Sequence, residues 1–390
     1  MHLHEFQSKQ LLKKAGMAVP KGVVFGSVEE LEEKWPSWAE SGAWLKAQVH
    51  AGGRGMAGGV LFGSDRNELF HKAKQLFQHR IVNQQTGPSG LPIQTILLSE
   101  PVAIVREQYL ALIFSPAKKN YLFLAAQGGG MEIEMRPKKE VLTFPLPSEK
   151  KLRSYHRLLL HKHMGWGSSL QEIAFPLIDS LITFFFQMDC LLLEINPLVE
   201  DTAGHLIALD AKISLDENAL FRHQELTPWR DLGQLTQQEA QAHQIGLSYI
   251  SLEGNIGCLV NGAGLAMATL DLLQLSGGHA ANFLDIGGSA TEETMQQGLQ
   301  LLFSDPKVKV VLIHIFGGII SCKAIGEALL HSLHTLSSSC PIVIRFAGTE
   351  AKEGLAIFQS TSQRIYLAEN FDEAVSLSVA LAKETKWPSS

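Results

Sequence analysis

The chain has little cysteine, little net charge and no C-x-x-C motif. Only four of its 390 residues are cysteines, and they are scattered, so neither a disulfide framework nor a zinc site is predicted. The formal net charge of −6 gives no electrostatic reason to expect nucleic acid or an acidic membrane as a partner. These features favour an intracellular, reducing compartment, and we expect a cytoplasmic protein.

Long hydrophobic runs are also missing. The most apolar stretch, Ala174 to Leu193, is interrupted by Pro176, Asp179 and Asp189, which predicts a core helix followed by a strand and no membrane span. The N-terminal residues Met1 to Phe6 lead directly into a polar helical pattern, so no signal peptide is predicted.

Length and composition predict a folded protein with more than one domain. The chain exceeds one ordinary domain, and its 45% hydrophobic and 18% charged residues are typical of a globular protein with a large core. We expect a first domain over residues 1–235, with a compact subdomain at about 20–100, and a second over 236–390. The Gln-rich stretch 225–245 is predicted to be the linker.

The second domain shows a regular alternation of strand and helix patterns. Its near-continuous apolar strands, each followed by a helix, predict a doubly wound parallel sheet. The strands are expected at Ile256–Asn261, Ala281–Ile286, Val308–Phe316, Pro341–Ala347 and Arg364–Ala368, and the helices at Gly264–Leu275, Thr291–Phe303, Cys322–Leu336, Glu350–Gln359 and Phe371–Glu384.

A glycine-rich loop spans His50 to Gly59 and contains five glycines and one arginine. Glycine lets backbone N–H groups approach a ligand, and arginine adds a fork of donors, so the loop is typical of phosphate binding. Gly53, Gly55 and Gly58 match G-x-G-x-x-G, but the dinucleotide fingerprint must open a helix. Here a strand-like run follows, which predicts a loop between two antiparallel strands.

Lys46 lies on the strand before this loop. A strand lysine that points at nucleotide phosphates is one interpretation, and a solvent-facing lysine is the other. The chain contains no G-K-[ST], which excludes a P-loop.

A predicted hairpin places an amide beside a carboxylate. Strands are expected at Leu191–Glu200 and Leu206–Ile213, and a turn centred on Ala203 would pair Asn196 with Asp210 and Glu194 with Lys212 on one face. An amide oxygen and a carboxylate suit Mg²⁺, which takes few protein ligands and completes its shell with phosphates and water. A surface hairpin with a salt bridge is the alternative.

Glycines also cluster where strands of the second domain end. Ligands of open α/β sheets bind at this edge, and the segment from Gly262 to Gly264 opens a helix whose N-terminus suits an anion. Glycines that serve only tight turns are the alternative. The clusters are Asn261–Gly264, Asp285–Ser289, Phe316–Ile320 and Ala347–Thr349.

Together these motifs resemble one family, the β subunits of succinate–CoA ligase (succinyl-CoA synthetase). The resemblance spans essentially the whole chain, and Pro20 resembles the ADP-forming type. It is carried by His4–Lys9, Lys46, Val49–Gly55, Glu194–Leu198, Asn218–Arg222, Asn255–Cys258, Asn261–Gly264 and Phe316–Ile319.

The resemblance implies an ATP-grasp domain followed by a flavodoxin-like CoA-ligase domain. It implies an α subunit as partner, in an αβ or α2β2 complex, with CoA bound mainly through α. Succinyl-CoA, phosphate and ADP would give succinate, CoA and ATP through a phosphohistidine on α, with Mg²⁺ as cofactor and ATP or ADP as the nucleotide. No nucleic acid and no membrane are expected as partners.

The resemblance also assigns roles by position. Asn196 and Asp210 would hold Mg²⁺, the pair that the hairpin register selects, and Glu194 would orient the phosphohistidine. Asn261, Gly318, Ile319 and Ile320 would bind succinate and phosphate, with Gly262, Ala263 and Gly264 facing the phosphohistidine. The nucleotide would be held by Lys46, Gly53, Arg54, Gly55, Glu100 and Glu107.

Several positions depart from the family pattern at ligand-facing loops. The family usually has lysine where this chain has Met56. The glutamate that the family has at the position of Ser99 stands one residue later here, at Glu100, and in an extended segment this shift turns the side chain to the opposite face. Gly128, Ser321, Lys323 and Ala347 also replace residues typical of the family. They motivate two alternatives: a sister ligase for another dicarboxylate such as malate, or a weakened paralogue kept to bind α or nucleotide.

Overall fold

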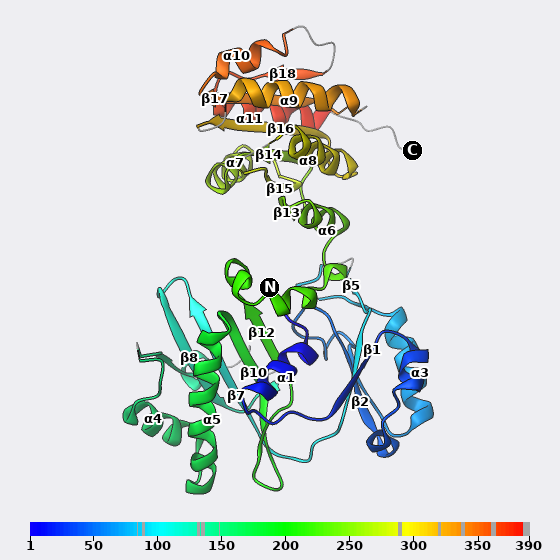
Figure 1. Cartoon of the computed structure of the whole chain (residues 1–390), viewed down its shortest axis with the longest axis vertical. Coiled ribbons are helices and arrows are strands. Elements are labelled where there is room, and N and C mark those ends of the chain that lie inside the picture. The colour runs from blue at the N-terminus through cyan, green and yellow to red at the C-terminus, as the bar shows by residue number, and fades with distance from the viewer. Residues whose placement is uncertain are drawn as a thin grey trace. The chain divides into compact units, whose positions relative to one another are not determined.

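A computed structural model of the chain describes residues 1–83, 85–87, 90–130, 133, 137–147, 149–287, 291–318, 321–336, 340–359 and 364–384. Its contacts divide the chain into two compact units, Met1–Gln234 and Leu235–Ser390 (Figure 1). Each unit consists of β-sheets and the helices that pack on them.

One lobe of the first unit is a four-stranded antiparallel sheet in the order β1-β6-β2-β3. The glycine loop joins β2 to β3, which pair antiparallel with Lys46 opposite Val60, so the predicted strand–loop–strand arrangement is confirmed. Helices α2 and α3 and a two-stranded β4-β5 ribbon complete the lobe. The bounds are β1 Gly22–Phe25, α2 Val28–Glu33, β2 Ala43–Ala47, β3 Val60–Gly63, α3 Arg66–Gln78, β4 Arg80–Ile81, β5 Leu91–Pro92 and β6 Ile96–Ser99.

The other lobe is a six-stranded sheet in the order β11-β10-β7-β8-β9, with β12 also paired to β10. Leucines and phenylalanines of α1, α4 and α5 pack on it to form one core. The bounds are α1 Glu5–Lys14, β7 Ile104–Ser115, β8 Asn120–Gln127, β9 Leu142–Pro145, α4 Ser154–Met164, α5 Ser168–Gln187, β10 Cys190–Asp201, β11 Leu206–Ala208 and β12 Ala211–Leu215.

The apolar stretch at 174–193 forms the end of α5 and the start of β10, as predicted for a core helix followed by a strand. Among the described residues, α5 is the one helix that is long and apolar enough to cross a membrane by length and composition. Its Leu181, Ile182 and Phe185 are fully buried in the core of the first unit.

The predicted linker at 225–245 is wrong in its extent. Residues Gln224–Trp229 form a short 3-10 helix that buries Leu226 in the first unit, and Leu232–Gln234 form another. Helix α6 (Gln237–Gln244) follows, capped by a reciprocal Thr236–Glu239 pair. Glutamine is a good helix former, and the capping box starts the helix, so this stretch is structured.

The second unit is a six-stranded sheet in the order β13-β15-β14-β16-β17-β18. All neighbours pair parallel except β13, an antiparallel edge strand that the sequence did not predict. Apart from β13, the order is that of flavodoxin-like folds. The bounds are β13 Ser248–Ser251, β14 Ile256–Val260, α7 Ala263–Leu275, β15 Asn282–Asp285, α8 Glu292–Ser304, β16 Val310–Gly317, α9 Cys322–Thr335, β17 Ile342–Gly348, α10 Ala351–Ala356, β18 Ile365–Leu367 and α11 Phe371–Glu384.

Helices cover both faces of this sheet (Figure 1). Helices α6, α8, α9 and α10 contribute to one apolar layer, and α7 and α11 contribute to the other. The doubly wound parallel sheet predicted for the second domain is therefore confirmed.

Candidate functional site

Lys46 and Arg54 converge on a buried carboxylate, Glu5. Lys46 Nζ donates to Glu5 Oε1 at 2.9 Å and to the carbonyl oxygen of Leu209 at 2.9 Å. Arg54 Nη2 donates to Glu5 Oε2 at 2.9 Å and to Asp210 Oδ2 at 2.8 Å. The structure thus brings together Lys46, Arg54 and Asp210, three residues predicted to bind the nucleotide or its metal.

The electrostatics of this cluster follow from its burial. Burial alone would raise the pKa of Glu5, but the Lys46, Lys9 and Arg54 cations hold that pKa well below its usual range. Burial lowers the pKa of Lys9, whose Nζ lies 2.7 Å from Glu5 Oε1, to about 8. Burial opposes the charge on Arg54 as well, but Asp210 and Glu5 outweigh it and raise the pKa of Arg54. Glu5 is therefore ionised.

The backbone of the glycine loop has donors available for a ligand. The N–H groups of Gly53, Arg54, Gly55 and Met56 make no hydrogen bond to another described residue. The neighbouring Gly52 is tied down, because its N–H donates to Gln85 Oε1 at 2.8 Å. Successive free N–H groups form concave anion sites in proteins, so this arrangement suits phosphate oxygens.

The hairpin register predicted from the sequence is confirmed. Glu194 pairs with Lys212 across β10 and β12, and the Asn196 N–H donates to the carbonyl oxygen of Asp210 at 3.1 Å. Glu194 is half-buried and interacts with a neighbouring group. It faces the same side as Asn196, because side chains two residues apart on a strand share a face.

Asn196 on β10 and Asp210 in the bend between β11 and β12 present hard oxygens. Asn196 Oδ1 accepts the Gly130 N–H at 2.5 Å and keeps a second lone pair, and the Asp210 side chain is 34% exposed. No group of three or more His, Cys, Asp or Glu side chains placed to hold a metal occurs in the described part of the chain. The pair fits an ion such as Mg²⁺, which takes much of its shell from phosphates and water.

The two other predicted nucleotide residues have different surroundings. Glu107 is exposed on β7. Its Oε2 lies beside Gly130, because a Cβ built on that glycine would be 3.4 Å from it, and Gly130 is the residue that hydrogen-bonds to Asn196. Glu100 follows β6, and its Oε1 lies 3.3 Å from Lys21 Nζ. Ser99 is buried and shares a strand face with Lys46, because it pairs with Trp44.

The predicted substrate loops lie at the carboxyl edge of the sheet in the second unit. Asn261 Nδ2 donates to the Phe316 carbonyl, and the Phe316 N–H donates to Asn261 Oδ1, both at 2.8 Å. Gly262, with φ +113°, precedes α7, whose first residues are Ala263 and Gly264. Gly318 is described, whereas Ile319 and Ile320 lie outside the described residues.

Asp285 and Ser321 connect these loops in ways that the sequence reasoning missed. Asp285 Oδ1 accepts the N–H groups of Gly262 at 2.6 Å and Gly287 at 2.8 Å. Ser321 caps α9 by accepting the Lys323 and Ala324 N–H groups, and its hydroxyl donates to Glu350. An aspartate at the carboxyl end of a strand and a serine before a helix were the available signals.

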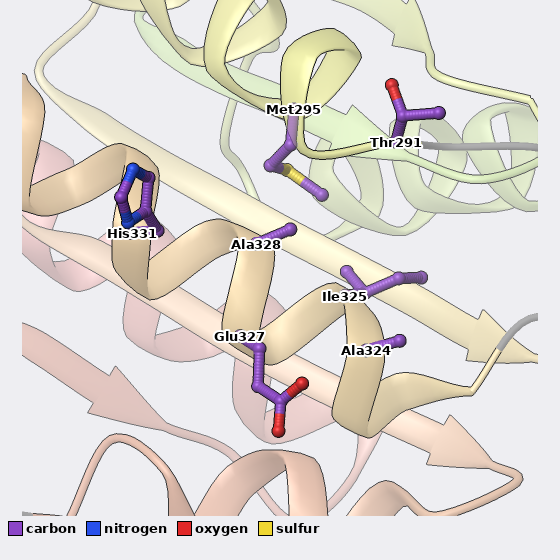
Figure 2. Close-up of a pocket in the computed structure, with 7 residues that line it drawn as sticks. All are labelled: Thr291, Met295, Ala324, Ile325, Glu327, Ala328 and His331. Atoms are coloured by element: carbon purple, nitrogen blue, oxygen red, sulfur yellow. The ribbon is translucent and has the colours of Figure 1, made fainter.

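A separate cavity of about 440 Å³ lies in the second unit between α8 and α9 (Figure 2). Thr291, Glu327 and His331 line it together with the apolar Met295 and Ile325. None of the predicted site residues is among its lining residues.

Comparison with protein families identifies both parts of the chain. Residues 2–200 match the ATP-grasp domain family, and residues 259–379 match the CoA-ligase family.

Several curated proteins are similar over nearly the whole chain. The succinate–CoA ligase [ADP-forming] subunit beta of Protochlamydia amoebophila is 41% identical over 99% of this chain and 100% of that protein. The protein of the same name from Thioalkalivibrio sulfidiphilus is 39% identical over 97% of this chain and 99% of its own length. Among solved structures, the ATP citrate lyase of Methanothrix soehngenii in complex with citrate and coenzyme A has a TM-score of 0.73, covering 97% of this chain and 99% of that one. At 16% identity, this similarity concerns the fold.

Proposed function

The chain belongs to the family of ADP-forming succinate–CoA ligase β subunits, and from that premise we propose that it supplies the nucleotide and succinate sites of such a ligase. Its partner is an α subunit that carries a phosphohistidine and most of the CoA site. The overall reaction is the reversible conversion of succinyl-CoA, phosphate and ADP to succinate, CoA and ATP.

The observation that carries the proposal is the convergence of Lys46, Arg54 and Asp210 beside the free N–H groups of the glycine loop. Phosphoryl transfer requires groups that position the phosphates and neutralise their charge, with little covalent chemistry by the protein. Lys46 and Arg54 bind phosphate oxygens, and the N–H groups of Gly53 and Gly55 cover them.

Asn196 and Asp210 hold Mg²⁺, and Glu107 lies at the edge of this pair. Bound Mg²⁺ offsets the negative charge of the phosphate oxygens. Glu194, on the same strand face as Asn196, accepts a hydrogen bond from the phosphohistidine ring and orients it toward the nucleotide. To contribute to nucleotide binding, the Glu100 carboxylate must first break its ion pair with Lys21 Nζ.

The second unit supplies the succinate and phosphate end. Asn261, held by Phe316, and the segment Gly318–Ile320 bind the carboxylate, and the N-terminus of α7 at Gly262–Gly264 faces the phosphohistidine. A helix N-terminus with unsatisfied N–H groups favours an anion there. The complex is αβ or α2β2, and it is cytoplasmic.

The test of this function is the overall reaction of the chain purified with its α subunit. ATP, CoA, Mg²⁺ and succinate are expected to give succinyl-CoA, with malate a poorer substrate. Faster turnover of malate would identify the sister ligase, and binding of α without turnover of either acid would identify a weakened paralogue.

Changing Met56 to lysine is expected to strengthen ADP binding. Met56 lies in the glycine loop with 65% of its surface exposed, so a lysine there adds a cation beside the phosphates without disturbing a core. An exposed ion pair contributes up to about 1 kcal/mol, which lowers the dissociation constant about threefold to fivefold.

Isothermal titration of ADP measures this change, and the matched control is Met267→Lys. Met267 is similarly exposed on α7, outside the ATP-grasp domain, and its replacement adds the same charge. Equal affinities of Met56→Lys and the parent chain would refute the role of the loop position.

A further inference from the structure

Glu5 is the most completely buried charged group in the neighbourhood of the glycine loop. It is the first residue of α1, its side chain is 1% exposed, and no family role was assigned to it above. Both of its carboxylate oxygens are used, because Oε1 contacts Lys9 and Lys46 while Oε2 contacts Arg54.

The number of cations around this carboxylate exceeds what burial requires. An ionised carboxylate inside a protein needs a partner, and a single well-placed cation with hydrogen bonds supplies it. Lys9, four residues along the same helix, already places a cation 2.7 Å from Glu5 Oε1. The other two cations come from β2 and from the glycine loop, 41 and 49 residues away, and both are predicted phosphate ligands.

We propose that Glu5 is a positioning residue of the nucleotide site, which holds Lys46 and Arg54 in the orientation that phosphate binding requires. The inference rests on the proposed function, because it assumes that these two cations bind the nucleotide.

The donors of the two cations are consistent with this role. An ammonium group has three donors, and Lys46 uses two of them, on Glu5 and Leu209. A guanidinium group has five, and Arg54 uses Nη1 on the Ala47 carbonyl and Nη2 on Glu5 and Asp210. Lys46 and Arg54 therefore each keep at least one donor for a phosphate while Glu5 fixes the rest of the group.

The charges of this cluster are also consistent with a positioning role for Glu5. Glu5 and Asp210 carry two negative charges, and Lys9, Lys46 and Arg54 carry three positive ones. The negative charge of Glu5 offsets the repulsion between Lys46 and Arg54 and so lets both cations lie at one site.

The test uses Glu5→Gln in the full chain and two ligands, ADP and adenosine. Glutamine offers one acceptor oxygen and no charge, so one of the two cations loses its contact with residue 5, and the dissociation constant of ADP is expected to rise about tenfold. Adenosine, which has no phosphate, is expected to bind within about twofold of the parent chain. A purely structural role of Glu5 would weaken both ligands equally, and that result would overturn the proposal.

Lys9→Met is the matched control, because it breaks a buried ion pair of Glu5 and leaves Glu5 with Lys46 and Arg54. ADP binding by Lys9→Met is expected to stay within about threefold of the parent chain. Weakening equal to that of Glu5→Gln would show general disruption and contradict the proposal.

Glu5→Asp covers the case in which the glutamine variant does not fold. Its carboxylate keeps the charge but is one methylene too short to reach both cations. ADP is therefore expected to bind more weakly, whereas the affinity for adenosine should not change. Unchanged ADP binding by a folded Glu5→Asp would refute the proposal. A parent chain that fails to bind ADP would instead refute the proposed function.

Discussion

Replacing Asp210 with asparagine is expected to slow phosphoryl transfer between ADP and the phosphohistidine of the α subunit by about 10²–10³-fold. The substitution keeps the side-chain size but removes the anionic oxygen proposed to bind Mg²⁺, and one preorganised electrostatic group contributes an effect of this size. It also deprives Arg54 of an ion pair at 2.8 Å. Single-turnover rapid-quench measurements at several Mg²⁺ concentrations report the rate, and high Mg²⁺ should restore part of it.

The control for this experiment is Asp271→Asn. Asp271 is exposed on α7 in the second unit, so the same loss of charge is made in a unit that does not contain the proposed metal pair. A transfer rate for Asp210→Asn close to that of Asp271→Asn would rule out Asp210 as a metal ligand.

Replacing Lys46 with methionine is expected to raise the dissociation constant of ADP about 100-fold. Methionine keeps the unbranched apolar stem that lies on β2 but removes the donor, and a hydrogen bond to a charged group contributes about 1.5–3 kcal/mol. Glu5 keeps Lys9 and Arg54 as partners, so its ionised state survives the change. Isothermal titration measures the affinity, and the thermal midpoint verifies that the variant is folded.

Lys72→Met is the corresponding control, because Lys72 lies on α3 of the same lobe and pairs with Glu68 at the surface. ADP affinity of that variant should match the parent chain. If Lys46→Met bound ADP within about threefold of the parent, the role of Lys46 in phosphate binding would be refuted.

Local patterns were sufficient to predict the hairpin and the second sheet. The turn before His205 is fixed by Asp201, whose carboxylate accepts the N–H groups of Ala203 and His205, and the period of two then sets Glu194 opposite Lys212. In the second unit, apolar strands and amphipathic helices alternate without interruption, so the order of elements follows directly. The edge strand β13 was missed because Ser248–Ser251 is short and half polar.

Two of the three partners of Glu5 could not be predicted from the sequence. They lie 41 and 49 positions later, and a single chain gives no indication that a helix N-terminus will meet a strand and a loop so far along it. The position of Glu100 shows the same difficulty, because its pairing with Lys21 depends on the register between β1 and β6. The sequence indicates which residue types suit phosphate, and the fold decides which of them meet.

The departures at Met56 and Ser321 have different structural consequences. Met56 is exposed and leaves the loop without the cation that a lysine would add, so we expect it to weaken phosphate binding. Ser321 instead gains a local role, since it caps α9 and its hydroxyl donates to Glu350. Nothing in the structure explains why Ala347 stands where glutamate is typical of the family.

The most direct test of the proposed function is the loss of phosphohistidine from the α subunit. The chain is purified in complex with its α subunit, α is phosphorylated with labelled phosphate, and ADP with Mg²⁺ is added. The account predicts that the label leaves α and appears in ATP, and that both changes require this chain. Label that stays on α at saturating ADP and Mg²⁺ would contradict it.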